Sequence, residues 1–282
     1  MWLVYINALH LKDKLRAFLK EDIGHGDISS NLLFKDAKGK IYIMAKEDGV
    51  FCGKDIITEG YRLLDEQVLV RHYMDDGDKV RQGDRIAEAS GKIAALLAGE
   101  RVILNLLQRL SGIATLTNKA VSILADPHTR ICDTRKTTPG LRMLEKYAVR
   151  CGGGFNHRFG LDDAIMLKDN HLAFAGSIQH AITNIRAQVG HTVKIEVEVE
   201  SGEQVQEAVK AGADIIMFDN CTPERVKEYQ QLVPSHIVTE ASGGIQLDNL
   251  ANYRHTGVDY ISLGFITHSI QALDISVEVI EG

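Results

Sequence analysis

Beyond residue 129 the chain alternates short apolar runs with amphipathic segments. The apolar runs predict strands at RICDT, DAIMLKDN, TVKIEVEVE, ADIIMFDN, HIVTEASGG and VDYISLGF. The amphipathic segments predict helices over residues 177–189, 202–211, 223–232 and 247–255. Ser201 with Gln204, and Thr222 before Pro223, predict where two of these helices begin. Strands that alternate with helices in this way form right-handed βαβ units around a parallel sheet.

About six to eight such units close most simply into a barrel. We therefore predict an α/β barrel of the TIM-like kind, complete or incomplete. An open, doubly wound sheet is the alternative. No glycine fingerprint follows the first strand, although the dinucleotide-binding version of the doubly wound fold requires one.

The region before residue 110 has a mixed pattern that predicts an α+β domain. Its predicted elements are a helix over 9–19, strands within 40–53 and 67–73, and a helix over 55–64. Apolar residues from Ile93 to Leu124 recur at helical spacing, which predicts a long helix that Gly112 kinks or interrupts. The predicted domains are an N-terminal domain over 1–110 and a catalytic barrel over 111–269, with 270–282 returning to the first domain.

The composition narrows the class of protein. Hydrophobic residues are 45% and charged residues 25% of the 282 residues, which excludes a disordered chain, a collagen and a coiled coil. The net charge of -6 argues against a general nucleic-acid binder. No apolar stretch approaches the roughly 20 residues of a membrane span, and the N-terminal run is too short for a signal peptide. Four cysteines without a CxxC pair indicate reduced thiols, so we expect a cytoplasmic protein with no membrane or nucleic-acid partner.

In barrels of this kind the active site lies at the carboxyl ends of the strands, where this chain is rich in polar residues. The cations that come from the first two units are Arg135, Lys136, Arg158 and Lys168. Arginine forks pair with carboxylates and phosphates, so these neighbouring cations predict a pocket for an anion with two acidic groups. The alternative is solvated loop charge, or salt bridges to Asp133 and Asp169.

Acidic residues follow the third and fourth predicted strands. Glu196, Glu198 and Glu200 alternate along one strand, so their side chains share one face. Carboxylates gathered inside a barrel need a cation or basic partners. With Asp219 on the next strand, Glu198 is a candidate for holding Mg²⁺, directly or through water. A ladder of Glu side chains paired with Lys and Arg is the alternative.

Glycines follow the last two strands, at residues 242–244 (SGG) and 262–264 (SLG). Backbone N–H groups beside helix N-termini form a phosphate cradle at this position in a barrel, although SGG alone also fits a tight turn. His157, His171 and His268 are candidates for ligand binding or acid–base chemistry, with hydrogen-bonded structural roles as the alternative. The sequence shows no nucleophile–base–acid triad.

Taken together, these segments resemble the quinolinate phosphoribosyltransferase family, also called nicotinate-nucleotide pyrophosphorylase (carboxylating). The segments that carry the resemblance are EDIGHGDIS at 21–29, GER at 99–101, DTRKTTPGLR at 133–142, GGGFNHRFGLDDAIMLKDNH at 152–171, EVEVES at 196–201, MFDN at 217–220, EASGGI at 240–245 and SLGFITHS at 262–269. They cover nearly the whole chain, in the order that the family has.

The resemblance implies a Mg²⁺-dependent pentosyltransferase with the fold of type II phosphoribosyltransferases. Such an enzyme transfers phosphoribose from phosphoribosyl pyrophosphate (PRPP) to quinolinate with decarboxylation. The products are nicotinate mononucleotide, CO₂ and pyrophosphate, on the route of de novo NAD synthesis. The resemblance also implies a homodimer, or a hexamer, in which the N-terminal domain of one subunit caps the barrel of the other and Arg101 reaches into the partner's site.

The same motifs imply roles for individual residues. The residues expected to bind substrate are Arg101, Thr134, Arg135, Lys136, His157, Arg158 and Lys168. The residues expected to act in catalysis are Lys136, Lys168, Glu198 and Asp219. Of these, Glu198 and Asp219 are also expected to face Mg²⁺ and the ribose hydroxyls. The residues expected to bind phosphate are Ser242, Gly243, Gly244, Ser262, Leu263 and Gly264.

Two other functions compete with this interpretation. A paralogous family linked to molybdenum-transport operons shares the fold and a TRKT segment but acts on another substrate. It departs from the LKDNH, EVEVES and MFDN segments, which are intact here. A biotinyl or lipoyl carrier would suit the glycine-spaced segment DDGDKVRQGD, but the short motif that presents the carrier lysine is missing from this sequence.

Overall fold

The computed structural model describes residues 6–279, which form two compact units. The first unit contains residues up to Asn118, Met143–Gly153 and the segment from Ser269; the second contains Lys119–Arg142 and Gly154–His268. The first unit therefore takes in residues 111–118, 143–153 and 269, all from the range predicted for the barrel. Residues 1–5, which belong to the N-terminal run compared with a signal peptide, lie outside the described residues. So do residues 280–282 of the predicted returning segment.

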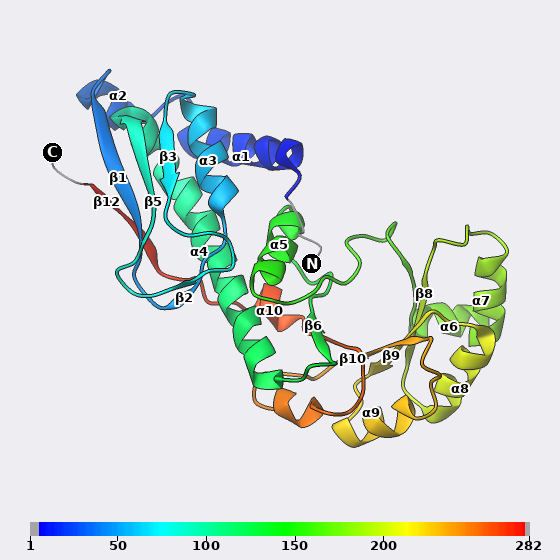
Figure 1. The fold of residues 1–282 in the computed structure, drawn as a ribbon. Coiled ribbons are helices and arrows are strands. Elements are labelled where there is room, and N and C mark those ends of the chain that lie inside the picture. Colours follow the sequence, from blue (N-terminus) through cyan, green and yellow to red (C-terminus); the bar gives the residue numbers. More distant parts are fainter. Residues whose placement is uncertain (1–5, 280–282) are drawn as a thin grey trace. The chain divides into compact units, whose positions relative to one another are not determined.

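The first unit is built on an antiparallel sheet (Figure 1). Its strands lie in the order β12 (Ile275–Val279), β1 (Lys38–Ala45), β5 (Arg85–Lys92) and β3 (Leu69–His72). A second pairing joins β2 (Gly49–Val50) to β4 (Lys79–Val80). Because β12 pairs with β1 from Ile41↔Val279 to Ala45↔Ile275, the returning segment is part of this sheet at least as far as Val279.

The helices that lie wholly or mainly in the first unit include one of 32 residues, α4. The helices here are α1 (Ala8–Ile23), α2 (Ile28–Leu33), α3 (Lys54–Leu64), α4 (Ile93–Leu124) and α5 (Arg142–Cys151). α4 confirms the long helix predicted over the same residues, but it continues through Gly112, so the predicted interruption is wrong. A Cβ atom at Gly112 would lie 2.2 Å from the carbonyl oxygen of Gln271. The glycine permits a close approach of the returning chain.

The second unit contains a six-stranded parallel sheet. Its strands are β6 (Arg130–Cys132), β7 (Ile165–Leu167), β8 (Ile195–Val199), β9 (Ile215–Asp219), β10 (Val238–Ser242) and β11 (Tyr260–Ser262). Its helices are α6 (Asp169–Ala175), α7 (Ile178–Arg186), α8 (Gly202–Ala211), α9 (Pro223–Gln230), the 3₁₀ helix η1 (Leu250–Tyr253) and α10 (Phe265–His268). All six predicted strands are confirmed, whereas the helix predicted over 247–255 is only the short η1.

The strand order is singly wound. It runs β6-β11-β10-β9-β8-β7. From β7 to β11 each strand lies beside the next one in the chain, and the first strand, β6, lies beside the last, β11. A doubly wound sheet reverses its order at an internal strand, and this sheet does not. Within residues 6–279 no ladder joins β6 to β7, and a closed barrel is not found. An isolated parallel bridge joins Cys132, the last residue of β6, to Phe155, which lies in no named strand. The fold is α/β with an N-terminal domain.

Local signals fix where the loops at the strand ends turn. The Ser201 hydroxyl accepts the N–H of Gln204 at 3.3 Å and caps α8, which begins three residues after the last residue of β8. The Gln204 side chain accepts the N–H of Glu200 at 2.8 Å, one residue earlier than a standard capping box. Thr222 caps α9 in the same manner, by accepting the N–H of Arg225 at 3.4 Å. No helix within the described residues is long and apolar enough to cross a membrane.

Candidate active site

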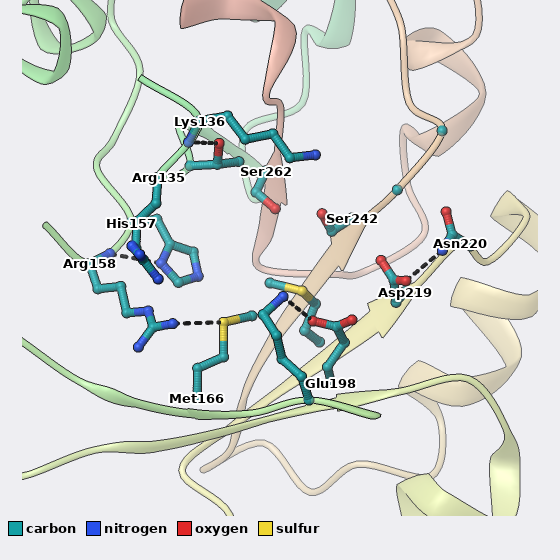
Figure 2. Close-up of a pocket in the computed structure, with 15 residues that line it drawn as sticks. Arg135, Lys136, His157, Arg158, Met166, Glu198, Asp219, Asn220, Ser242 and Ser262 are labelled. Carbon is teal, nitrogen blue, oxygen red and sulfur yellow. Dashed lines mark hydrogen bonds and ion pairs between the residues drawn. The ribbon is translucent and has the colours of Figure 1, made fainter. Parts of the chain in front are cut away.

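A cavity of about 460 Å³ lies at the carboxyl ends of the strands in the second unit (Figure 2). The predicted site residues that line it are Thr134, Arg135, Lys136, His157, Arg158, Lys168, Glu198, Asp219, Ser242, Gly243, Gly244 and Ser262. In a parallel sheet every strand points the same way, so its carboxyl ends share one edge. That geometry brings these residues together from widely separated positions in the sequence.

Three predicted residues are not part of the cavity lining. Leu263 is fully buried, and its N–H donates to the carbonyl of Cys132 at 2.9 Å. Gly264 lies against a lining side chain, because a Cβ atom there would be 3.0 Å from Cδ of Lys136. Arg101 is exposed on α4 in the first unit. Its expected place in a partner's site stays a prediction.

The guanidinium groups of Arg135 and Arg158 form a cationic wall of the cavity. Nη1 of Arg158 donates to the carbonyl of Ala164 at 2.8 Å, and Nη2 donates to the sulfur of Met166 at 3.6 Å. Burial, followed by the positive charge of Arg135, lowers the pKa of Arg158. Since the two cations destabilise one another, an anion that binds between them relieves their repulsion. The wall therefore suits a carboxylate or a phosphate.

Carboxylates form another part of the lining. Nζ of Lys168 lies 2.7 Å from Oε2 of Glu198, so this lysine pairs with Glu198 and not with the neighbouring Asp169 considered above. Burial, and then the charges of Glu198 and Glu200, raise the pKa of Asp219. A carboxylate that its surroundings destabilise gains from a bound cation, and carboxylate oxygen is the donor that Mg²⁺ prefers. Glu198 and Asp219 therefore fit a Mg²⁺ ion.

The loop after β10 depends on glycine. Gly243 has a φ of +84° and Gly244 a φ of +64°. The N–H of Asn220 donates to the carbonyl of Ser242 at 2.8 Å, which draws the loop after β9 against this turn. A Cβ atom at Gly243 would lie only 2.2 Å from Oδ1 of Asn220, whereas one at Gly244 would meet nothing within 4 Å. Position 243 thus requires glycine both because of its positive φ and because a side chain would collide with Asn220.

This difference makes the two glycines a matched pair for mutation. Gly244→Ala is expected to cost about 1–2 kcal/mol of unfolding free energy, because alanine is strained at positive φ. Gly243→Ala is expected to lower the melting temperature further, since it adds the contact with Asn220. Thermal unfolding by circular dichroism would check the order. Equal melting temperatures would contradict the role assigned to the Asn220 contact.

Sequence reasoning missed three lining residues, Met166, Met217 and Asn220. The methionines are apolar residues inside strands, where the sequence cannot distinguish a pocket wall from a packed core. Asn220 has a φ of +51°, and its side-chain amide donates to the Asp219 carboxylate. Its position directly after a strand was the available signal. His171 has the structural role that was its alternative, because Nδ1 accepts the N–H of Lys168 at 3.2 Å.

The fold and this pocket define an α/β protein whose small-molecule site lies at the carboxyl ends of its parallel strands and is lined by cations, carboxylates and a glycine turn. Two family models match: "Quinolinate phosphoribosyl transferase, N-terminal domain" over residues 27–111, and the corresponding C-terminal domain over 113–278. The chain belongs to the quinolinate phosphoribosyltransferase family.

Individual relatives agree with this assignment. A probable nicotinate-nucleotide pyrophosphorylase (carboxylating) of Bacillus subtilis is 57% identical, over 97% of this chain and 95% of the relative. Quinolinate phosphoribosyltransferase (decarboxylating) 2b of Nicotiana tabacum is 37% identical, over 95% of this chain and 82% of the relative. The crystal structure of NadC from Streptococcus pyogenes has a TM-score of 0.94 and 42% identity, and the match covers 99% of this chain and 100% of that chain.

Proposed function

We propose that the protein transfers phosphoribose from PRPP to quinolinate with decarboxylation, giving nicotinate mononucleotide, CO₂ and pyrophosphate. The observation that carries the proposal is the division of the pocket. Figure 2 shows Arg135 and Arg158 on one side of the cavity, and Asp219 and Ser242 on the other. A pyridine with two carboxylates suits the first side, and a phosphorylated sugar suits the second.

On the cationic side, Arg135, Lys136 and Arg158 bind the two quinolinate carboxylates in this proposal. Guanidinium forks pair with carboxylates bidentately, which fixes the plane of the pyridine ring as well as its position. The backbone of Lys136 is held on both sides: its N–H donates to Oγ1 of Thr134 at 3.0 Å, and its carbonyl accepts the hydroxyl of Thr267 at 2.7 Å. These bonds support a defined position for its side chain.

On the opposite side, the proposal puts the ribose hydroxyls near Glu198 and Asp219, and the phosphate on the glycine loops. Mg²⁺, held by these two carboxylates directly or through water, would neutralise charge on the pyrophosphate. Lys168 neutralises Glu198 through its 2.7 Å ion pair before substrate enters. The backbone around Gly243 and Gly244 offers N–H groups to the phosphate.

The reaction then needs positioning and charge, and no enzymic nucleophile. The pyridine nitrogen attacks the anomeric carbon as pyrophosphate leaves, through a centre with oxocarbenium character. The carboxylates of Glu198 and Asp219 stabilise the positive charge that develops there. Once the ring nitrogen is quaternary, its positive charge stabilises the electron pair left on the neighbouring ring carbon when the carboxylate departs as CO₂, and a proton from solvent then adds to that carbon. Holding both substrates in one cavity supplies the rest of the rate enhancement, through proximity and orientation.

Three further features belong to the proposal. The sheet is an incomplete barrel, supported by the singly wound order and by the bridge that extends the free edge of β6 at Phe155. The enzyme is a homodimer or a hexamer of such dimers, in which Arg101 enters the partner's site; the exposure of Arg101 is compatible with this role. The enzyme is cytoplasmic, in keeping with four free cysteines.

Incubation of the pure protein with quinolinate, PRPP and Mg²⁺ is expected to give nicotinate mononucleotide, detected by mass spectrometry. Reactions without quinolinate, without PRPP or with excess chelator are the controls, and each is expected to give none. A folded protein that binds PRPP but makes no nicotinate mononucleotide would contradict the proposal. That result would point to another acceptor, such as the substrate of the molybdenum-linked paralogues.

A further inference from the structure

The His157 ring in the cavity wall is bonded at both nitrogens. Nδ1 accepts the backbone N–H of the next residue, Arg158, at 2.8 Å (Figure 2). Nε2 lies 3.2 Å from each carboxylate oxygen of Glu196 and 3.6 Å from Oε1 of Glu240. These two glutamates come from β8 and β10, and only 2% and 5% of their surfaces are exposed.

These contacts determine the protonation of the ring. A nitrogen that accepts an N–H bond presents a lone pair, so Nδ1 carries no proton. The single proton of the neutral ring is therefore on Nε2, from which it is donated to Glu196. An imidazolium would place a second N–H against the N–H of Arg158. The group His157, Glu196 and Glu240 has the residue types of a metal site, but Nε2 has no lone pair left for a cation.

The groups around the ring also shift the pKa of Glu240. Burial, and then the charge of Glu196, raise the pKa of Glu240 to about 7. Glu240 is thus only partly ionised near pH 7, and Glu196 is also the nearer carboxylate, so Glu196 is the partner of the Nε2–H group. On its other side, the backbone N–H of His157 donates to the buried carboxylate of Asp133 at 2.9 Å. Both the ring and the backbone of His157 are anchored.

We propose that Glu196 and Glu240 are positioning residues that hold His157 in its neutral Nε2–H form, so that Nδ1 fixes the backbone of Arg158 in the cavity wall. His157 then acts on the pocket through Arg158. The proposal rests on the proposed function only in taking Arg158 as a quinolinate ligand. The form of the ring is independent of the substrate.

Two uncharged substitutions separate positioning from charge. His157→Asn puts Oδ1 at the place of Nδ1 and keeps an acceptor for the N–H of Arg158, whereas His157→Gln lacks an acceptor there. We expect the quinolinate KM of the Gln variant to exceed that of the Asn variant by about tenfold, the effect of one hydrogen bond. Initial rates at saturating PRPP would give KM and kcat for both. Equal increases in KM would overturn the proposal, because the acceptor for the N–H of Arg158 would then make no difference.

A double-mutant cycle tests whether Glu196 acts through His157. Glu196→Gln is expected to raise the quinolinate KM, and to add almost nothing when combined with His157→Gln. Effects that simply multiply would show that Glu196 acts separately and would overturn its role as a positioning residue. Melting temperatures would confirm that each variant is folded before its KM is compared.

A spectrum of the unmutated protein tests the ring directly and needs no turnover. With ¹⁵N-labelled histidine, the His157 signals can be identified among the 11 histidines by their loss in the His157→Gln variant. At pH 7 we expect a protonated Nε2 and an unprotonated Nδ1. An imidazolium pattern, or a proton on Nδ1, would overturn the proposal. If quinolinate is not converted but the expected pattern is found, the proposed function fails while the assignment of the ring stands.

Discussion

The Arg135→Ala variant is expected to have a quinolinate kcat/KM about 100-fold below that of the wild type, with a nearly unchanged melting temperature. Hydrogen bonds to charged groups contribute about 1.5–3 kcal/mol each, and a guanidinium fork makes them in pairs. Arg135 is exposed at the cavity, and burial together with its charge lowers the pKa of Arg158. Its removal therefore takes away attraction for the anion without disturbing a packed core.

Calorimetric titration with quinolinate and steady-state rates would measure this loss. Arg225→Ala is the matched control, because Arg225 is exposed on α9 and does not line the cavity. Arg135→Lys keeps the charge without the fork, and an intermediate affinity is expected. Unchanged quinolinate affinity in the alanine variant would remove Arg135 from the proposed binding site.

The Asp219→Asn variant is expected to lose about 100-fold or more in kcat/KM while becoming slightly more stable at neutral pH. The loss follows because the amide supplies neither negative charge for the developing cation nor an anionic donor for Mg²⁺. The gain follows from the raised pKa of Asp219. An acid whose pKa is higher in the folded than in the unfolded state loses stability as pH rises through that range, so a neutral side chain removes this cost.

Rates at several Mg²⁺ concentrations, together with thermal unfolding at pH 5 and pH 7, would test both halves. The gain in melting temperature is expected at pH 7 and should shrink as the pH falls through the raised pKa of Asp219, because the protonated acid no longer carries the cost. Asp248→Asn is the control, since Asp248 is exposed and does not line the cavity. Wild-type activity in the Asp219 variant would exclude this carboxylate from the reaction. A lower melting temperature at pH 7 would exclude the electrostatic cost.

The most accurate sequence predictions concerned features with local causes. α8 spans Gly202–Ala211, the predicted range, because its start depends on the Ser201 cap and its end on Gly212 in the left-handed region. α4 likewise follows from the spacing of its apolar residues. The interruption predicted at Gly112 was wrong. A glycine is needed there because the backbone of Gln271, far along the chain, lies too close for a Cβ atom. A single glycine gives no sign in the sequence of which segment approaches it.

The three glutamates of the segment EVEVES show where pattern stops being sufficient. Alternation placed their side chains on one face, yet Glu196 is buried beneath His157, Glu198 lines the cavity, and Glu200 is exposed beyond the end of β8. Depth along a strand, and the neighbours supplied by other strands, decide between these environments. Neither quantity has a sequence period.

The sequence by itself determined the alternation of strands and helices, the polar residues that end the strands, and the resemblance to one family. These properties depend on side-chain periodicity and on capping residues a few positions apart. Only the tertiary structure decided the singly wound order with β6 beside β11, the methionines in the cavity wall and the partners of the two ring nitrogens of His157. These depend on burial and on contacts between residues distant in the chain, which exist only once the strands have been brought together.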